Sequence, residues 1–260
     1  MKQRPDSMGF FWHDKPPEPK VLKEKVKVTP PDPVWLEDDY LPNYEVARNA
    51  VFNMFTNREL TDACIRCEKL IFDIECYPNY FLIAFKSVVS GKVLFFELSD
   101  ELELDVCKLQ WVISNFTVIG FNSRDYDVPM AMLAIAGKST AELHNCSNIL
   151  IQDGVRGYQM LRMNRLKDLT KDHIDIIEVA PLRASLKLYT GRLHCPTMQD
   201  LPFAPQSNLT EPQLTILRWY CINDLDNTEI LYNELKPEIT LREELGKQYK
   251  LDLRSKSDAQ

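Results

Sequence analysis

Apolar residues in the first half of the chain recur in short runs that are typical of β-strands. Three of these runs follow one another closely, with turn residues between them at Pro78-Asn79 and Ser90-Gly91. The second turn predicts a hairpin, so we expect three neighbouring antiparallel strands, followed later by two more. The five expected strands cover residues 69–76, 80–89, 92–98, 117–122 and 174–179.

Between and after these runs, apolar positions recur every three or four residues, as they do on one face of a helix. The longest such pattern begins near Glu211 and continues through Leu231. An antiparallel start followed by alternating helices and strands indicates an α/β fold with one mixed sheet, to which the later strands add in parallel and which helices flank. The other expected helices cover residues 43–55, 58–67, 105–115 and 127–137, with short pieces around 185–189.

The first 42 residues differ in composition, because they contain half of the chain's 16 prolines. Residues 15–33 mix proline with charged residues without periodicity and are not expected to form a core. Phe10-Phe11-Trp12 is either a docking peptide or part of an arm that packs onto its own domain, and we favour the arm because aromatic rings gain by burial. The expected organisation is a flexible arm at 1–42, a helical lead-in at 43–68 and a main domain at 69–260.

Composition narrows the class of protein. Hydrophobic residues make up 45% of the chain, enough for a full core, and the net charge of −7 argues against a protein that coats nucleic acid by charge alone. We expect a soluble, cytoplasmic protein without membrane contact, because no apolar run approaches about 20 residues and no signal peptide is apparent. Seven irregularly spaced cysteines suit a reducing compartment. Cys64 and Cys67 form a CxxC pair, which we expect to be buried structural thiols, since zinc needs two further ligands.

Two acidic residues lie two positions apart within the first predicted strand. Alternate residues of a strand point to the same face, so Asp73 and Glu75 are expected to aim their carboxylates in one direction. Two acids inside an apolar strand are costly to bury without cations. An edge strand with one solvated face has the same pattern, so this block alone is weak evidence.

Two further acidic blocks follow. Asp127 is expected at the start of a helix, where an acid is also common as a cap or dipole partner, and Asn122 and Tyr126 before it are residue types that contact sugars or bases. Tyr220 and Asp224 are four residues apart on the long helix and therefore share a face. The alternative for that helix is ordinary amphipathic packing by neighbours such as Cys221, and Asp226 is expected to face solvent.

The three blocks, in this order and on these elements, resemble the DnaQ-like exonuclease superfamily. Asp73, Glu75, Asp127 and Asp224 match its four acids, and Tyr220 matches the branch that carries a tyrosine before the last acid. The sister branch has a histidine five residues before that acid, and none of the four histidines here has this spacing. Residues 73–79, 122–127, 185–187, 198–202 and 251–256 are similar to proofreading domains of phage-type, family B-like DNA polymerases, and the likeness covers residues 70–260.

The resemblance implies an RNase H-like fold and hydrolysis with two Mg²⁺ ions, for which Mn²⁺ can substitute. Asp73, Glu75 and Asp224 would hold the ion that activates water, with Asp73 also bridging to the second ion. Asp127 would support the second ion, and Tyr220 would orient the attacking water. An all-oxygen set of ligands suits hydrolysis of a phosphodiester at the end of a nucleic acid.

The resemblance also assigns candidate contacts to nucleic acid. Phage-type members carry a lysine between the second and third motifs that residues 195–198 lack, so Lys187, Arg192 or His194 is left to neutralise the scissile phosphate. Residues 151–195, with eight basic against five acidic side chains, either track phosphates or are simply solvated. Tyr158 and Tyr189 either stack on bases or belong to the core. The residues expected to grip the single-stranded 3′ end are Asn122, Tyr126, Ser185, Leu186, Lys187 and Arg192.

Together these features predict a 3′→5′ exodeoxyribonuclease that acts on single-stranded or frayed DNA ends and proofreads for a DNA polymerase domain or subunit. A phage-encoded protein of this kind would work in the host cytoplasm. Two alternatives stay open: a 3′→5′ exoribonuclease of the same fold, and an inactive domain that binds nucleic acid or a polymerase.

Overall fold

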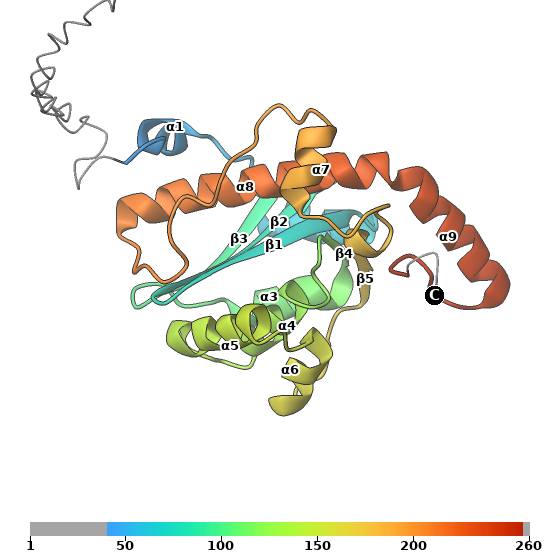
Figure 1. Ribbon diagram of the computed structural model, residues 1–260, viewed down its shortest axis with the longest axis horizontal. Coiled ribbons are helices and arrows are strands. Elements are labelled where there is room, and N and C mark those ends of the chain that lie inside the picture. The colour runs from blue at the N-terminus through green and yellow to red at the C-terminus, as the bar shows by residue number, and fades with distance from the viewer. Residues whose placement is uncertain (1–40, 257–260) are drawn as a thin grey trace, which may run out of the picture. The chain divides into compact units, whose positions relative to one another are not determined.

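A five-stranded mixed sheet forms the centre of the computed structural model, which describes residues 41–256 (Figure 1). The strand order is β3-β2-β1-β4-β5, with β1 antiparallel to β2 and parallel to β4. β2 is antiparallel to β3, and β4 is parallel to β5. The expected α/β architecture with a mixed sheet is therefore confirmed. The strands are β1 (Lys69–Tyr77), β2 (Tyr80–Ser87), β3 (Val93–Leu98), β4 (Thr117–Gly120) and β5 (Asp172–Asp175).

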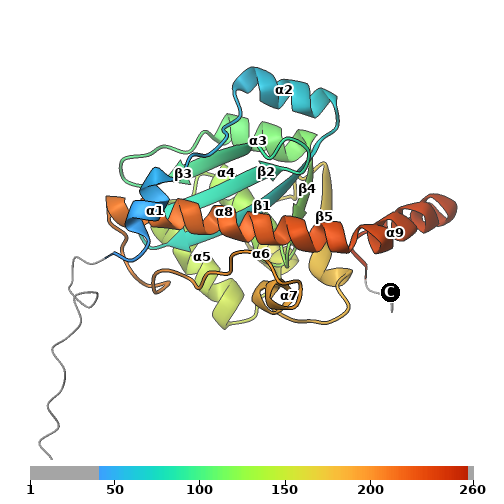
Figure 2. The same cartoon turned by 90° about the horizontal axis from the view of Figure 1, so that it is seen from above.

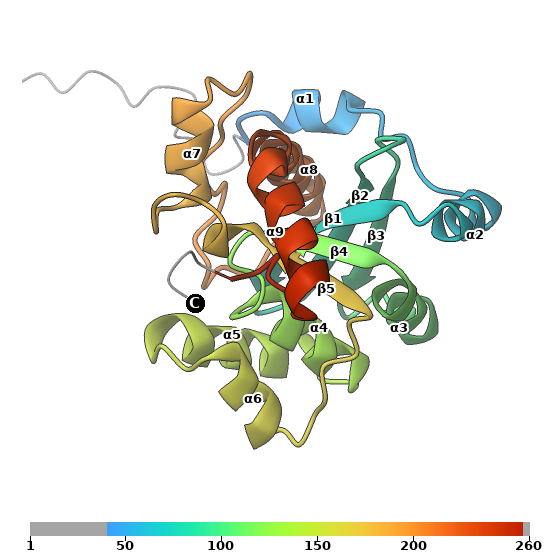
Figure 3. The same ribbon diagram turned by 90° about the vertical axis from the view of Figure 1, so that its right-hand side faces the viewer.

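Helices cover both faces of this sheet (Figures 1 and 3). α8 crosses one face and α9 continues from its end, whereas α3, α4 and α5 lie on the opposite face, with α6 beyond them (Figures 1 and 2). The helices are α1 (Tyr44–Asn49), α2 (Asn57–Ile65), α3 (Val106–Asn115), α4 (Asp127–Ile135), α5 (Thr140–Gln152), α6 (Gly157–Met163), α7 (Leu186–Arg192), α8 (Glu211–Glu234) and α9 (Lys236–Tyr249), with a 3-10 turn at Ile176–Glu178.

The central strand β1 contributes to two hydrophobic cores because its side chains alternate between the faces of the sheet. Phe72 and Ile74 pack into the core shared with α3, α4 and α5. Ile71 and Tyr77 pack into the core on the opposite face, together with apolar residues of α8 such as Leu217. The odd-numbered positions of β1 therefore face α8.

The fifth strand is shorter than expected. The sequence predicted a strand over residues 174–179, but β5 ends at Asp175 and a 3-10 turn follows at Ile176–Glu178. The Asp175 side chain accepts a hydrogen bond from the Ile177 backbone N–H at 3.3 Å, which favours the turn. Ile176 stays fully buried, so its burial does not require a strand.

The lead-in segment also departs from expectation. Its helical pattern gives only the six-residue α1, and Val46 and Val51 are 57% and 95% exposed rather than packed. α2 begins at a capping box between Thr56 and Glu59. The prediction that Cys64, near the end of this helix, and Cys67, just after it, are buried thiols was wrong: Cys64 is half-buried, and Cys67 is exposed.

Some expectations fall on residues outside the described range. Phe10-Phe11-Trp12 and nearly all of the proline-rich segment belong to residues 1–40 and lie outside the described residues. Between residues 41 and 256, no helix is both long and apolar enough to cross a membrane.

Candidate functional site

A cavity of about 730 Å³ lies beside the central strand β1, between the loop after β4 and α8. It is lined by side chains from β1, from the start of α4 and from α8, which are about 150 residues apart in the sequence at their extremes. The structure thus brings together all five residues predicted to be catalytic. These are Asp73, Glu75, Asp127, Tyr220 and Asp224.

β1 supplies two carboxylates to the cavity from the face that α8 covers. Glu75 is 8% exposed, whereas Asp73 is half-buried. Burial, together with the nearby Asp224 carboxylate, raises the pKa of Asp73 from 3.8 to about 8. Burial and the neighbouring Asp73 likewise raise the pKa of Glu75. The two acids therefore repel each other in a site that excludes most water.

α8 brings the third motif to the same place. Thr210 and Gln213 form a capping box at its start, and the helix then runs without a break through Tyr220 and Asp224. These two side chains lie one turn apart and share a hydrogen bond. Burial raises the pKa of the Tyr220 hydroxyl, so Tyr220 stays protonated and acts as a donor near neutral pH.

Asp127 is the first residue of α4 and is only 3% exposed. Its Oδ1 has no hydrogen-bond partner within residues 41–256. Burial raises the pKa of this carboxyl, and Asp73 raises it further. The helix start alone does not account for a buried oxygen without a partner, since an acid at a helix N-terminus normally receives a backbone N–H or remains in water.

Sequence reasoning missed Asp175, which organises the loop before Asp127. This aspartate is 2% exposed at the end of β5 and accepts the backbone N–H groups of Asn122 and Arg124, each at 2.9 Å. Asn122 adopts a left-handed conformation with φ 59°, and the aspartate holds that bend in place. Burial raises the pKa of Asp175 to about 6. The Ser255 hydroxyl accepts the Asp175 backbone N–H at 2.9 Å, so the C-terminal segment supports the same loop.

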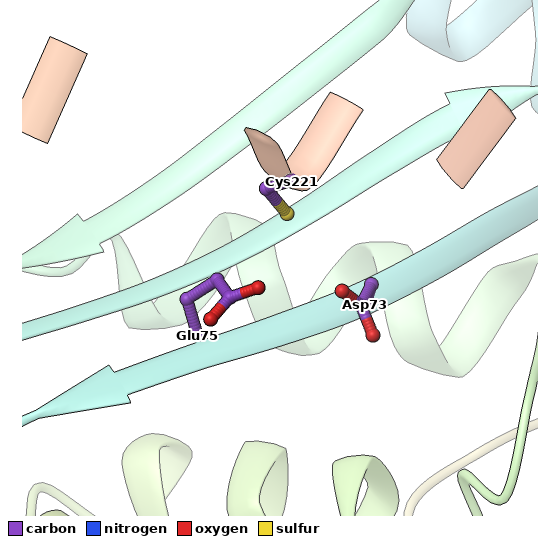
Figure 4. Close-up of side chains that lie close together, drawn as sticks. All are labelled: Asp73, Glu75 and Cys221. Atoms are coloured by element: carbon purple, nitrogen blue, oxygen red, sulfur yellow. The ribbon is translucent and has the colours of Figure 1, made fainter. Parts of the chain in front are cut away.

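Cys221 also faces this site, although it was expected only to pack in the core. It is fully buried, and its sulfur and one oxygen each of Asp73 and Glu75 all lie within 4.8 Å of one another. Figure 4 shows the thiol extending from α8 toward the two carboxylates of β1. The residue was hard to find because a cysteine in a helical apolar pattern looks like any other core position.

The residues predicted to grip nucleic acid divide into two groups. Asn122 and Tyr126 line the cavity, and the Tyr126 hydroxyl lies 2.8 Å from the Ser147 hydroxyl. The remaining four, which are on or beside α7, do not line the cavity. Ser185 caps α7 through the Leu188 N–H, Leu186 packs against the core, Lys187 pairs with Asp200 at 2.9 Å, and Arg192 is exposed.

Cations near the site are few. Lys187 is close enough to lower the pKa of Glu75 and of Asp224, although burial outweighs it at both. Arg156 lines the cavity wall but forms an ion pair with Asp125 at 2.7 Å. Gly157 approaches the same loop so closely that a Cβ there would lie 2.3 Å from the Arg124 carbonyl oxygen. These contacts fix the segment just before α6 as one side of the cavity.

The two tyrosines considered for base stacking differ in environment. Tyr189 belongs to the core: it is 5% exposed, and its hydroxyl donates to the Leu182 carbonyl. Tyr158 lies on α6 and is 68% exposed, and the four basic residues that follow it in the sequence are also exposed. Those four are Arg162, Arg165, Lys167 and Lys171.

The donor set fits a divalent cation that prefers oxygen. Within the described range none of the four acids has a salt-bridge partner, their pKa values are all raised, and one buried oxygen lacks any partner. A bound cation relieves each of these costs at once. Comparison of the chain with protein-family models, with curated proteins and with solved structures finds no match in any of the three. The functional argument therefore rests on the chain's own sequence and structure.

Proposed function

We propose that this protein is a 3′→5′ exonuclease that removes nucleotides from single-stranded or frayed DNA ends by metal-assisted hydrolysis. The observation that carries the proposal is the meeting of Asp73, Glu75, Asp127, Tyr220 and Asp224 in one cavity. A chance acidic surface would not bring three motifs so distant in sequence to the same buried place.

The fold supports the proposal independently of the side chains. Three antiparallel strands, with two parallel strands added on the far side of β1, form a mixed sheet that is compatible with the proposed RNase H-like fold. This arrangement puts the first acidic pair on the central strand. The second motif then follows the neighbouring parallel strand β4, where loops at strand ends commonly form sites.

Asp73, Glu75, Asp127 and Asp224 would hold Mg²⁺, or Mn²⁺ in its place, at a two-ion site. When bound, the ions supply positive charge at the scissile phosphate and lower the pKa of a water molecule. The carboxylates then remain ionised near neutral pH, because the cations reverse the effects of burial and mutual repulsion.

The chain's own residues would bind and orient the substrate. The Tyr220 hydroxyl, protonated and hydrogen-bonded to Asp224, positions the attacking water. Asn122 and Tyr126 contact the terminal sugar and base from the cavity wall. Lys187, the cation whose charge reaches both Glu75 and Asp224, is the best-placed side chain to neutralise phosphate. Proofreading for a DNA polymerase is the setting in which such removal of 3′ nucleotides is useful.

The direct test is digestion of 5′-labelled single-stranded oligonucleotides by the full chain. We expect a ladder of products shortened from the 3′ end with Mg²⁺ and none with EDTA or with Asp73→Asn. Parallel DNA and RNA strands of one sequence separate a deoxyribonuclease from an exoribonuclease. Binding of DNA without cleavage in Mg²⁺ and in Mn²⁺ would instead identify an inactive binding domain.

A further inference from the structure

The Cys221 thiol lies directly against the two carboxylates of β1 and extends the set of possible metal ligands beyond oxygen. Its sulfur and one oxygen of each acid lie within 4.8 Å of one another (Figure 4). Tetrahedral Zn²⁺ with bonds of about 2.3 Å to sulfur and about 2.1 Å to oxygen places its ligands about 3.4–3.6 Å apart. The three atoms would have to approach one another by up to about 1.4 Å to share a single ion.

A second observation indicates a cation at the same place. Asp127 lines the same cavity, is 97% buried and has an Oδ1 without a hydrogen-bond partner among the described residues. Leaving a buried polar atom unpaired costs about 1–3 kcal/mol, and more if the group is charged. A cation bound in the cavity removes that cost. The unpaired Asp127 oxygen is therefore a reason to expect a cation that does not depend on Cys221 or on the acidic pair.

The sulfur changes which cation the site prefers. Mg²⁺ takes oxygen ligands, whereas thiolate ligands select softer ions such as Zn²⁺ and, by the same property, Cd²⁺. We infer that Asp73, Glu75 and Cys221 form a mixed carboxylate–thiol site that binds Zn²⁺ and Cd²⁺ more tightly than Mg²⁺, and that these ions inhibit hydrolysis by occupying it. The metal–sulfur bond forms as the thiol proton is released to solvent.

The inhibition rests on the proposed nuclease function, but the metal binding does not. Cys221 is fully buried, and its sulfur lies beside the carboxylates of Asp73 and Glu75, both of which line the cavity. Among the seven cysteines, Cys221 alone belongs to a cluster of possible metal ligands within residues 41–256. The cluster thus joins two acids of β1 to one thiol of α8.

The test is a Cd²⁺ titration followed by the ultraviolet charge-transfer absorption of a cadmium–thiolate bond. The protein carries serine at the four cysteines that are exposed or half-buried, which are Cys64, Cys67, Cys107 and Cys195. We expect the band to saturate at one equivalent of Cd²⁺. In Cys221→Ala the Cd²⁺ affinity should fall at least about 100-fold, the upper end of the loss caused by removing even an outer-shell partner. Cys146→Ala removes a buried thiol from α5 and should leave the band unchanged.

A second measurement tests the inference without the Cys221→Ala variant, so it does not require that this variant folds. Cadmium-113 NMR of the four-serine protein should give one resonance in the range of mixed sulfur and oxygen ligands. A resonance typical of oxygen ligands alone, or no charge-transfer band at one equivalent, overturns the inference. So does a band that persists in a folded Cys221→Ala protein.

The same preparations separate the two proposals. A normal Cd²⁺ band without any Mg²⁺-dependent cleavage sinks the nuclease function and leaves the metal site intact. Mg²⁺-dependent cleavage that Zn²⁺ inhibits equally with and without the Cys221 thiol sinks the inhibitory role and leaves the nuclease intact.

Discussion

Asp224 and Asp226 are two residues apart on α8, but within the described residues only Asp226 forms an ion pair with a basic side chain. Asp226 is 47% exposed at its side chain and pairs with Lys86 at 2.5 Å, and Glu229 one turn on pairs with the same lysine at 2.6 Å. Asp224 faces the cavity beside Asp73, and no lysine or arginine of the described residues pairs with it. One carboxylate pair is therefore neutralised by the chain itself, whereas the cavity acids have no salt-bridge partner among the described residues.

This difference is what distinguishes a structural charge cluster from a functional one. The Lys86 cluster has its counter-ion built into β2, so it stabilises the contact between the sheet and α8. The surrounding structure holds the cavity acids close together and buried, which costs folding free energy when they are charged. Titratable groups whose pKa values are shifted in this way are typical of sites arranged for a ligand.

The largest expected effect comes from exchanging the two aspartates for their amides. Asp224→Asn should lower the rate of oligonucleotide cleavage by about 1,000-fold, or about 4 kcal/mol of transition-state stabilisation, because it removes a cation ligand. Asp226→Asn should change the rate by less than about threefold, since an exposed ion pair contributes little. Single-turnover kinetics with saturating Mg²⁺ measure the cleavage rates of both variants. Equal losses of rate would show that Asp224 and Asp226 do not differ in function.

Removing the metal should make stability depend on pH in a defined direction. The folded pKa of Asp73 is about 8 and its unfolded value is near 3.8, so between these values the folded protein binds more protons than the unfolded chain. In EDTA the stability contributed by this group is present at low pH and is lost as pH rises toward 8. Thermal melts should therefore give a higher Tm at pH 6 than at pH 8, and Mg²⁺ should raise the Tm more at pH 8. An Mg²⁺ effect of equal size at both values would contradict this account.

Removing one charge from each region, that of Asp73 in the cavity or that of Lys86 in the ion-pair cluster, should shift stability in opposite directions. Without metal at pH 8, Asp73→Asn should raise the free energy of unfolding by about 1–2 kcal/mol, because it removes a costly buried charge, and solvent at the half-buried side chain limits the gain. Lys86→Met should lower it by about 1–2 kcal/mol, because two acids lose their common counter-ion. Chemical denaturation in EDTA compares the two variants, and a destabilised Asp73→Asn protein would show that the acids are not under strain.

Much of the site follows from local periodicity, and for that reason the sequence predicts it. Alternation along β1 places Asp73 and Glu75 on one face, and one helical turn separates Tyr220 from Asp224. Asp175 could not be predicted in the same way, because its role depends on backbone groups of a loop 50 residues earlier in the chain. The exposure of Val51 was equally hidden, since whether a periodic apolar residue is covered depends on which element packs beside it.

A smaller effect on cleavage than that of Asp224→Asn is expected at Asp175, which does not line the cavity. Asp175→Asn places an amide N–H₂ against one of the backbone donors of Asn122 and Arg124, which costs about 1–3 kcal/mol of stability. The loosened loop should raise the KM for oligonucleotides more than it lowers kcat, because Asn122 and Tyr126 lose their fixed positions. Steady-state kinetics of Asp175→Asn are compared with those of Ser255→Ala, which removes the hydroxyl that binds the Asp175 backbone N–H. The comparison shows whether the loss of either contact raises KM. A loss confined to kcat would place Asp175 among the groups that act on the reacting atoms instead.

The most direct test of the central claim is an anomalous difference map from crystals of the protein grown with Mn²⁺. We predict a peak within bonding distance of carboxylate oxygens of Asp73, Glu75 and Asp224, with Asp127 facing it directly or through water. A map in which Mn²⁺ binds beside Asp226 or elsewhere on the surface, while the cavity carboxylates bind none, would contradict the account.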